Sequence, residues 1–187
     1  MMFIYRIDDD TYLKLLGEEN TSQLYALIEG NRTYLARWLP WVDKMTDYQD
    51  VSRYILGTLQ QFSDNNGFFA GIWHKRMLVG VVGFHFFDWR NSRTALGYWL
   101  DEKHQGIGLM RKACIALVDY AVKELSINRI EIRCASFNTK SMSLAESLGF
   151  THEGVLRKVE KLGENWVDHV VYSVLSEEWH TEIDKPM

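Results

Sequence analysis

The Gln-Gly-Ile-Gly stretch at residues 105–108 constrains the fold more than any other part of the sequence. It lies between an extended apolar run at residues 95–100 and an amphipathic helix that should reach about Leu125. Glycine has no Cβ, so the chain can turn sharply there and leave its N–H groups open at the positive end of the helix dipole. Phosphate groups bind well at such a place, which makes the stretch a candidate anion site.

Two commoner phosphate-binding motifs are absent, because neither GxGxxG nor GxxxxGK[ST] occurs in the sequence. Two glycines before a helix can also form nothing more than a tight turn. The helix after residue 108 is predicted by apolar residues that recur three and four positions apart. They are Met110, Ala113, Cys114, Leu117, Val118, Ala121, Val122 and Leu125.

Extended and helical patterns alternate along the rest of the chain. Strands are expected at about 12–16, 68–73, 77–87, 94–100, 129–136, 150–161 and 166–175, with helices from Asn20 or Thr21 to about Ala36, after Asp47, and from Asn138 to Gly149. In the strand at 129–136, Ile130 and Ile132 alternate with Glu131 and Arg133, which predicts one buried and one solvated face. This order predicts a mixed α/β fold with about seven strands.

Composition limits the class of protein. With 187 residues, 47% of them hydrophobic and only two prolines, the chain suits a single domain spanning 1–187. The net charge of −4, without any basic run, argues against a nucleic-acid partner. Cys114 and Cys134 lack metal-ligand spacing and fit a reducing cytoplasm, and we expect no metal site. We also expect no signal peptide and no membrane span.

The element order, with a Gln-Gly-x-Gly turn after the fourth strand, resembles the GNAT superfamily of acetyl-CoA-dependent N-acetyltransferases. The family pattern [QR]-x-x-G-x-[GA] maps onto residues 105–110, although Met110 replaces its last small residue. Further matches look like the RimJ/RimL-type ribosomal-protein N-terminal acetyltransferases. They are Trp38-Leu39-Pro40-Trp41, Gly97-Tyr98-Trp99-Leu100, Asn138-Thr139-Lys140-Ser141, Leu148-Gly149-Phe150, Glu153-Gly154-Val155-Leu156-Arg157, and Asp168 with Tyr172.

The resemblance implies a single-domain fold whose mostly antiparallel sheet is splayed between its fourth and fifth strands and flanked by about four helices. It also implies residues that bind acetyl-CoA. These are Tyr98, Trp99 and Leu100 for the pantetheine arm, the amides of Gln105, Gly106, Ile107, Gly108, Leu109 and Met110 for the pyrophosphate, and Asn138 with Ser141 on the opposite side. Asparagine is also a favoured N-cap, so Asn138 can have that role alone.

Transfer of an acetyl group to an amine requires an uncharged nucleophile. About a tenth of an α-amine is neutral at pH 7, against under about a thousandth of a lysine amine, so an N-terminal acceptor needs a less demanding base. The resemblance places Glu160 near the acceptor as that base, while a solvated strand carboxylate is the alternative. Many relatives carry a glutamate where this chain has Ala95, and His85 and His104 are the fallback bases.

The departing thiolate needs a proton, for which Ser141 is the candidate. Ser141 lies one turn into the helix after Asn138, on the face of Leu144 and Leu148, so its hydroxyl should point inward. The alternative is a bond back to the cap backbone. Tyr172 is a second candidate acid or a hydroxyl that positions the acceptor.

The acceptor pocket is expected to include Trp38, Trp41 and His85, although the two tryptophans can equally serve as packing between helices. The sequence thus predicts an acetyl-CoA-dependent N-acetyltransferase that acts, without a metal, on the α-amine of a protein N-terminus, ribosomal by resemblance. Two rivals remain open: acetylation of a small amine such as a polyamine, amino acid or antibiotic, and a non-catalytic acetyl-CoA sensor. Resemblance also leads us to expect a homodimer.

Overall fold

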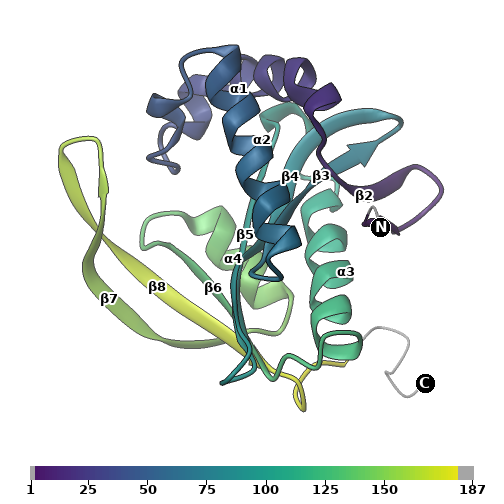
Figure 1. The fold of residues 1–187 in the computed structure, drawn as a ribbon. Helices are drawn as coiled ribbons and strands as arrows, with labels where there is room; N and C mark the ends of the chain where they lie inside the picture. The colour runs from purple at the N-terminus through teal and green to yellow at the C-terminus, as the bar shows by residue number, and fades with distance from the viewer. Residues whose placement is uncertain (1–2, 181–187) are drawn as a thin grey trace.

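The computed structural model describes residues 3–180, in which helices and strands follow nearly the predicted order (Figure 1). The strands are β1 (Ile4–Arg6), β2 (Thr11–Leu15), β3 (Phe68–His74), β4 (Met77–Asp88), β5 (Arg93–Leu100), β6 (Arg129–Ala135), β7 (Thr151–Leu162) and β8 (Asn165–Leu175). The helices are α1 (Thr21–Leu35), α2 (Tyr48–Ser63), α3 (Leu109–Lys123) and α4 (Thr139–Ser147), with short 3-10 turns at Glu18–Asn20, Val42–Lys44 and Glu102–His104.

All the strands join one sheet in the order β1-β2-β3-β4-β5-β6-β8-β7. Each of the seven predicted strands is present within one residue of its expected bounds. The additional strand, β1, pairs antiparallel with β2, so that Ile4 lies opposite Lys14. With three residues, β1 is too short to produce an alternating pattern in the sequence.

The sheet opens between β5 and β6, which are the only parallel neighbours in the described part of the chain. They pair only from Arg93–Leu96 to Arg129–Ile132. Beyond that point residues 97–100 pair with β4, and residues 133–135 pair with β8. The predicted splay is therefore confirmed, and Figure 1 shows the β7–β8 hairpin curving away from the rest of the sheet.

Helices cover both faces of the sheet. On one face, buried residues of α1 and α2, among them Leu24 and Ile55, pack with Val81 of β4. On the other face Val82, the next residue of β4, packs in a cluster that includes Leu117 of α3 and Ala145 of α4. Adjacent strand residues point to opposite faces, so β4 contributes to both cores.

The three predicted helix starts are confirmed, although only two of them have side-chain caps. Oδ1 of Asp47 accepts a hydrogen bond from the backbone N–H of Asp50 at 2.8 Å, and the Asn138 side chain caps α4. Helix α1 begins at Thr21 with Asn20 at its N-cap position, directly after a 3-10 turn. The Asn20 side chain accepts from the N–H of Gly17 and donates to Gln23, and it does not cap α1.

The prediction of one solvated face on β6 was also wrong, because Glu131 is only 5% exposed. Its carboxylate accepts hydrogen bonds from Arg129 Nε at 3.0 Å and from an Arg133 guanidinium nitrogen at 2.7 Å. Burial opposes ionisation here, but these bonds hold the pKa of Glu131 below its usual value. Charged residues on a strand can therefore form a buried ion network.

Replacing Glu131 with glutamine should lower the free energy of unfolding at pH 7 by about 1–2 kcal/mol. This is less than the roughly 3–5 kcal/mol of a fully buried pair, because both arginines remain partly in water. A lowered carboxyl pKa stabilises the fold above the unfolded value of 4.5 and ceases to do so as the pH falls below it. Urea denaturation should therefore separate Glu131→Gln from wild type at pH 7 but much less at pH 3.5. An equal difference at both pH values would contradict an ionic origin.

Candidate active site

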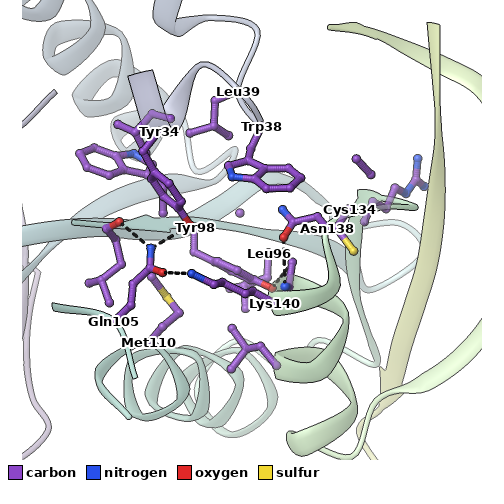
Figure 2. A pocket seen from close by; sticks show the side chains of 18 of the residues that line it. Tyr34, Trp38, Leu39, Leu96, Tyr98, Gln105, Met110, Cys134, Asn138 and Lys140 are labelled. Atoms are coloured by element: carbon purple, nitrogen blue, oxygen red, sulfur yellow. Dashed lines mark hydrogen bonds between the residues drawn. The ribbon is translucent and has the colours of Figure 1, made fainter. Parts of the chain in front are cut away.

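A cleft with a volume of about 1360 Å³ opens where β5 and β6 diverge. Its lining comes from α1 and the connection to α2, from β5, the 105–108 turn and the start of α3, and from β6, α4 and the β7–β8 hairpin. Figure 2 shows its side chains pointing toward one another from these separate elements. The splay thus brings segments distant in sequence into one site.

The glycine turn forms one end of the cleft. Gly106 has φ +78° and Gly108 has φ +81°, in the left-handed region that side chains disfavour. A Cβ added to either glycine would meet no atom within 4 Å, so space beside them is open. Gly108 is the N-cap of α3 and has no side-chain cap. Among residues 3–180, no hydrogen-bond acceptor faces the N–H groups of residues 106–110, which suits them to an anion.

The Gln105 side chain is held from both sides of the cleft. Its Nε2 donates to the hydroxyl of Tyr34 at 2.8 Å, and its Oε1 accepts from Nζ of Lys140 at 2.8 Å, as Figure 2 shows. The Lys140 ammonium also lies 5.7 Å from the centre of the Tyr34 ring. Lys140 thus adds a cation beside the turn. Its match to the Asn-Thr-Lys-Ser motif could have singled it out, whereas nothing in the sequence indicated Tyr34.

The other predicted coenzyme residues separate into two groups. Tyr98, Trp99, Leu100, Leu109 and Met110 all line the cleft. The side chain of Ile107, in contrast, is 60% exposed and lies outside the cleft lining, so only its backbone can contribute.

Ser141 lies inside the cleft, as its helical position predicted. Its Oγ and the hydroxyl of Tyr98 are 2.8 Å apart, and its N–H donates to Oδ1 of Asn138 at 3.2 Å. Burial raises the pKa of Tyr98, which keeps that hydroxyl protonated. The Asn138 side chain caps the helix through its oxygen, and its amide N–H groups have no partner in the part of the chain described. Cys134, which is buried, also lines the cleft.

The opposite wall carries titratable groups. Nε2 of His169 and Oε2 of Glu160 are 3.1 Å apart, and both residues line the cleft with His85 and Arg133. Burial lowers the pKa of His85, so its imidazole is neutral at pH 7. A Cβ on Gly97 would lie 2.3 Å from Nε2 of His85, so a larger residue at position 97 would displace the ring from this place. No pattern in the sequence associates His169 with Glu160.

The two tryptophans before α2 both line the cleft. The Trp41 ring stacks on Tyr54 of α2 at 6.2 Å and lies 6.3 Å from Trp99, so it serves both packing and the cleft wall. The Trp38 ring lies 5.5 Å from that of Phe137, which precedes α4. That contact joins the two sides of the cleft.

Two candidates from the sequence lie elsewhere. Tyr172 is 2% exposed and outside the cleft lining, and its hydroxyl donates to Oε1 of Glu146 at 2.9 Å. Burial raises its pKa to about 12. His104 is 2.6 Å from the Asp101 carboxylate and is also outside the lining. Neither side chain lines the cleft in these positions.

Within residues 3–180, no three histidine, cysteine or acidic side chains are placed to hold a metal ion. None of the helices there is long and apolar enough to cross a membrane.

Comparison with known proteins gives consistent results. The acetyltransferase (GNAT) domain model matches residues 12–151. Among individual proteins, the chain is 28% identical to the ribosomal-protein-serine acetyltransferase of Escherichia coli K12, over 90% of this chain and 94% of that protein. It is also 31% identical to YdaF of Bacillus subtilis strain 168, over 97% of this chain and all of that protein.

Solved structures extend the likeness to the fold. RimL, a ribosomal L7/L12 α-N-protein acetyltransferase in complex with coenzyme A, superposes with a TM-score of 0.90 at 25% identity, covering 92% of this chain and 98% of that one. The microcin C7 self-immunity acetyltransferase MccE, in complex with acetyl-CoA and AMP, gives 0.87 at 28% identity, covering 90% and 94%. These neighbours include both a protein-acetylating enzyme and an immunity enzyme.

Proposed function

The chain belongs to the acetyltransferase (GNAT) family, and we propose that it acetylates the α-amine at the N-terminus of a protein, with a ribosomal protein as its natural acceptor. It is an N-acetyltransferase that uses acetyl-CoA. One observation supports the proposal above the others. A glycine turn with unpaired N–H groups and a wall carrying Glu160 lie in the same cleft, on either side of the splay.

The residues present fit acetyl-CoA. The N–H groups of residues 106–110, the dipole of α3 and the Lys140 ammonium would hold its pyrophosphate. The pantetheine arm of acetyl-CoA would be held by the backbone of residues 97–100, which is no longer paired with β6, and by the free amide of Asn138. When bound, acetyl-CoA supplies an acetyl thioester as the electrophile.

We assign Glu160 the task of taking a proton from the acceptor ammonium, directly or through a water. Its carboxylate is a third exposed and lines the cleft beside His85 and Arg133. An α-ammonium needs little help to lose its proton near pH 7, so a carboxylate within reach of it suffices. His85, neutral at that pH, would line the acceptor pocket together with Trp38 and Trp41.

We assign Ser141 the task of donating a proton to the departing thiolate. Its Oγ is fixed by Tyr98 and by the Asn138 cap, and a coenzyme thiolate with a pKa near 8.5 leaves readily even with a weak donor. Tyr98 keeps the Ser141 hydroxyl oriented, because its raised pKa keeps its own hydroxyl protonated. Ser141 regains its proton from the acceptor nitrogen, which loses a second proton as the amide forms. Tyr172 has no part in this scheme, since its hydroxyl is bonded to Glu146.

Acetylation of a small amine is the second candidate, because an acetyltransferase of microcin C7 self-immunity is also similar to this chain, and its structure holds AMP beside acetyl-CoA. The protein acceptor is favoured by the exposed apolar residues of β7, where Val159 lines the cleft and Val155 and Leu156 precede it along the strand. The same exposed side chains support a homodimer, and the two free thiols support a cytoplasmic enzyme.

The test measures melting temperature and thiol release on one sample. Acetyl-CoA at about 100 times its Kd should stabilise the fold by about 2.7 kcal/mol, and so raise the melting temperature by about 5–10 °C. A peptide with a free N-terminal serine should then release thiol, whereas the same peptide with a blocked N-terminus and a lysine side chain should not. A temperature shift without release from the free peptide would favour a small amine or a sensor. No shift would exclude coenzyme binding.

A further inference from the structure

The β7 strand carries a large bulge immediately before Glu160. Leu156 pairs with His169 and Glu160 pairs with Val167, so three residues of β7 lie opposite a single residue of β8, Asp168. The middle residue of the three, Lys158, has φ +48°, a conformation that costs energy for a side chain other than glycine. A bulge of this kind re-aims the strand that follows it.

Two extra residues change which groups Glu160 can reach. In an unbroken ladder Glu160 would pair with Asn165, four residues and about 13 Å along the strand from His169. With the bulge it pairs with Val167, which makes His169 its diagonal neighbour on the same face. The 3.1 Å contact between Nε2 of His169 and Oε2 of Glu160 therefore depends on the bulge.

Asp168 holds the bulge in place. Its Oδ1 accepts a hydrogen bond from the backbone N–H of Lys158 at 2.7 Å, and its own carbonyl accepts from the N–H of Ser136 at 2.9 Å. The first bond fixes the residue with positive φ, and the second ties Asp168 to the end of β6. The next residue, His169, is only 15% exposed and contacts the carboxylate itself.

We propose that Asp168 and His169 are positioning residues for Glu160. Asp168 fixes the backbone of the bulge, and His169 fixes the carboxylate at the wall of the cleft, where His85 of β4 and Arg133 of β6 also face it. This inference rests on the proposed role of Glu160. It explains why an Asp-His pair stands on β8 opposite the larger of the two irregular places in β7.

The test is a double-mutant cycle measured by thiol release with the serine peptide. His169→Ala and Asp168→Ala should each lower kcat about tenfold and leave the KM for acetyl-CoA unchanged. His169→Gln and Asp168→Asn should recover most of the rate, because glutamine can still donate to Glu160 and asparagine can still accept from Lys158. Combined with Glu160→Gln, each alanine variant should reduce kcat by less than a further twofold, since its effect passes through Glu160.

The matched control is Glu164→Gln in the turn of the same hairpin, which should keep the wild-type kcat because its side chain is 95% exposed. The inference would be overturned if each alanine substitution still lowered kcat tenfold in the Glu160→Gln background, because Asp168 and His169 would then act independently of the carboxylate. An alanine variant of His169 with wild-type kcat would overturn it as well. Full activity of Glu160→Gln would remove Glu160 and this inference together, while thiol release by the wild type would still uphold the transferase. If Asp168→Ala fails to fold, the His169 arm decides alone.

Discussion

Replacing Gly108 with alanine is expected to raise the Kd for acetyl-CoA about 10- to 100-fold. The added methyl group would meet no protein atom, so it would project into the open space at the N-terminus of α3. An anion displaced from there loses about one charge-assisted hydrogen bond, which contributes about 1.5–3 kcal/mol, and 1.4 kcal/mol corresponds to a factor of ten. Isothermal titration of purified variant and wild type measures the change directly.

The same substitution also strains the backbone, and a matched control separates the two effects. Gly149 ends α4 with φ +83°, close to the +81° of Gly108, and a Cβ there also meets nothing within 4 Å. It lies outside the lining of the cleft. Gly108→Ala and Gly149→Ala should therefore each lower the free energy of unfolding by about 1 kcal/mol. Only Gly108→Ala should weaken acetyl-CoA binding. Equal affinities in the two variants would show that the glycine turn does not bind the pyrophosphate.

These glycines illustrate what the sequence alone could predict. A helical repeat with two glycines before it is a local pattern, so the turn, the helix and its open N-terminus could all be inferred from neighbouring residues. The inward direction of Ser141 followed in the same way from its place one turn after Asn138, and the structure puts it in the cleft. Strand bounds were accurate because turns and alternation are also local signals.

Contacts between distant segments could not be predicted in this way. The Gln105 side chain hydrogen-bonds to both Tyr34 and Lys140, which lie on two different helices. No sequence pattern within one element predicts these contacts. Tyr172 was expected in the site, but the helix α4 brings Glu146 to its hydroxyl. Glu131 was expected to be exposed to solvent, but two arginines of its own strand hydrogen-bond to its buried carboxylate. Local sequence indicated where each side chain lies along an element but not which partner it meets.

Bulges limit prediction in a different manner. The alternation of strand residues assumes one residue opposite one residue, and β7 departs from that rule by two positions before Glu160. Glu160 was therefore placed on its strand correctly, whereas its approach to His169 could not be anticipated. Asp168 was visible in the sequence as part of a family match, but its contact with the N–H of Lys158 needs the folded hairpin.

Replacing Glu160 with glutamine should lower kcat about 100- to 1000-fold at pH 7, with the KM for acetyl-CoA unchanged. Glutamine preserves the shape of the side chain and an oxygen that can accept from His169, but it cannot take a proton. General bases contribute about 10²- to 10⁴-fold, and the lower part of that range applies because an α-amine is already about a tenth neutral at pH 7. Stopped assays of the serine peptide, with both substrates saturating, measure the loss.

The pH profile of this variant distinguishes a lost base from a distorted site. Without an internal base the reaction depends on amine that is already neutral, and this fraction rises from about a tenth at pH 7 to about half at pH 8 and nearly all at pH 9. The kcat/KM of Glu160→Gln for the peptide should therefore rise several-fold between pH 7 and 9, and the gap to wild type should narrow. A distorted site would lose the same factor at every pH. A gap that stays constant from pH 7 to 9 would thus remove Glu160 as the base, and make the neutral imidazole of His85 the next candidate in the cleft.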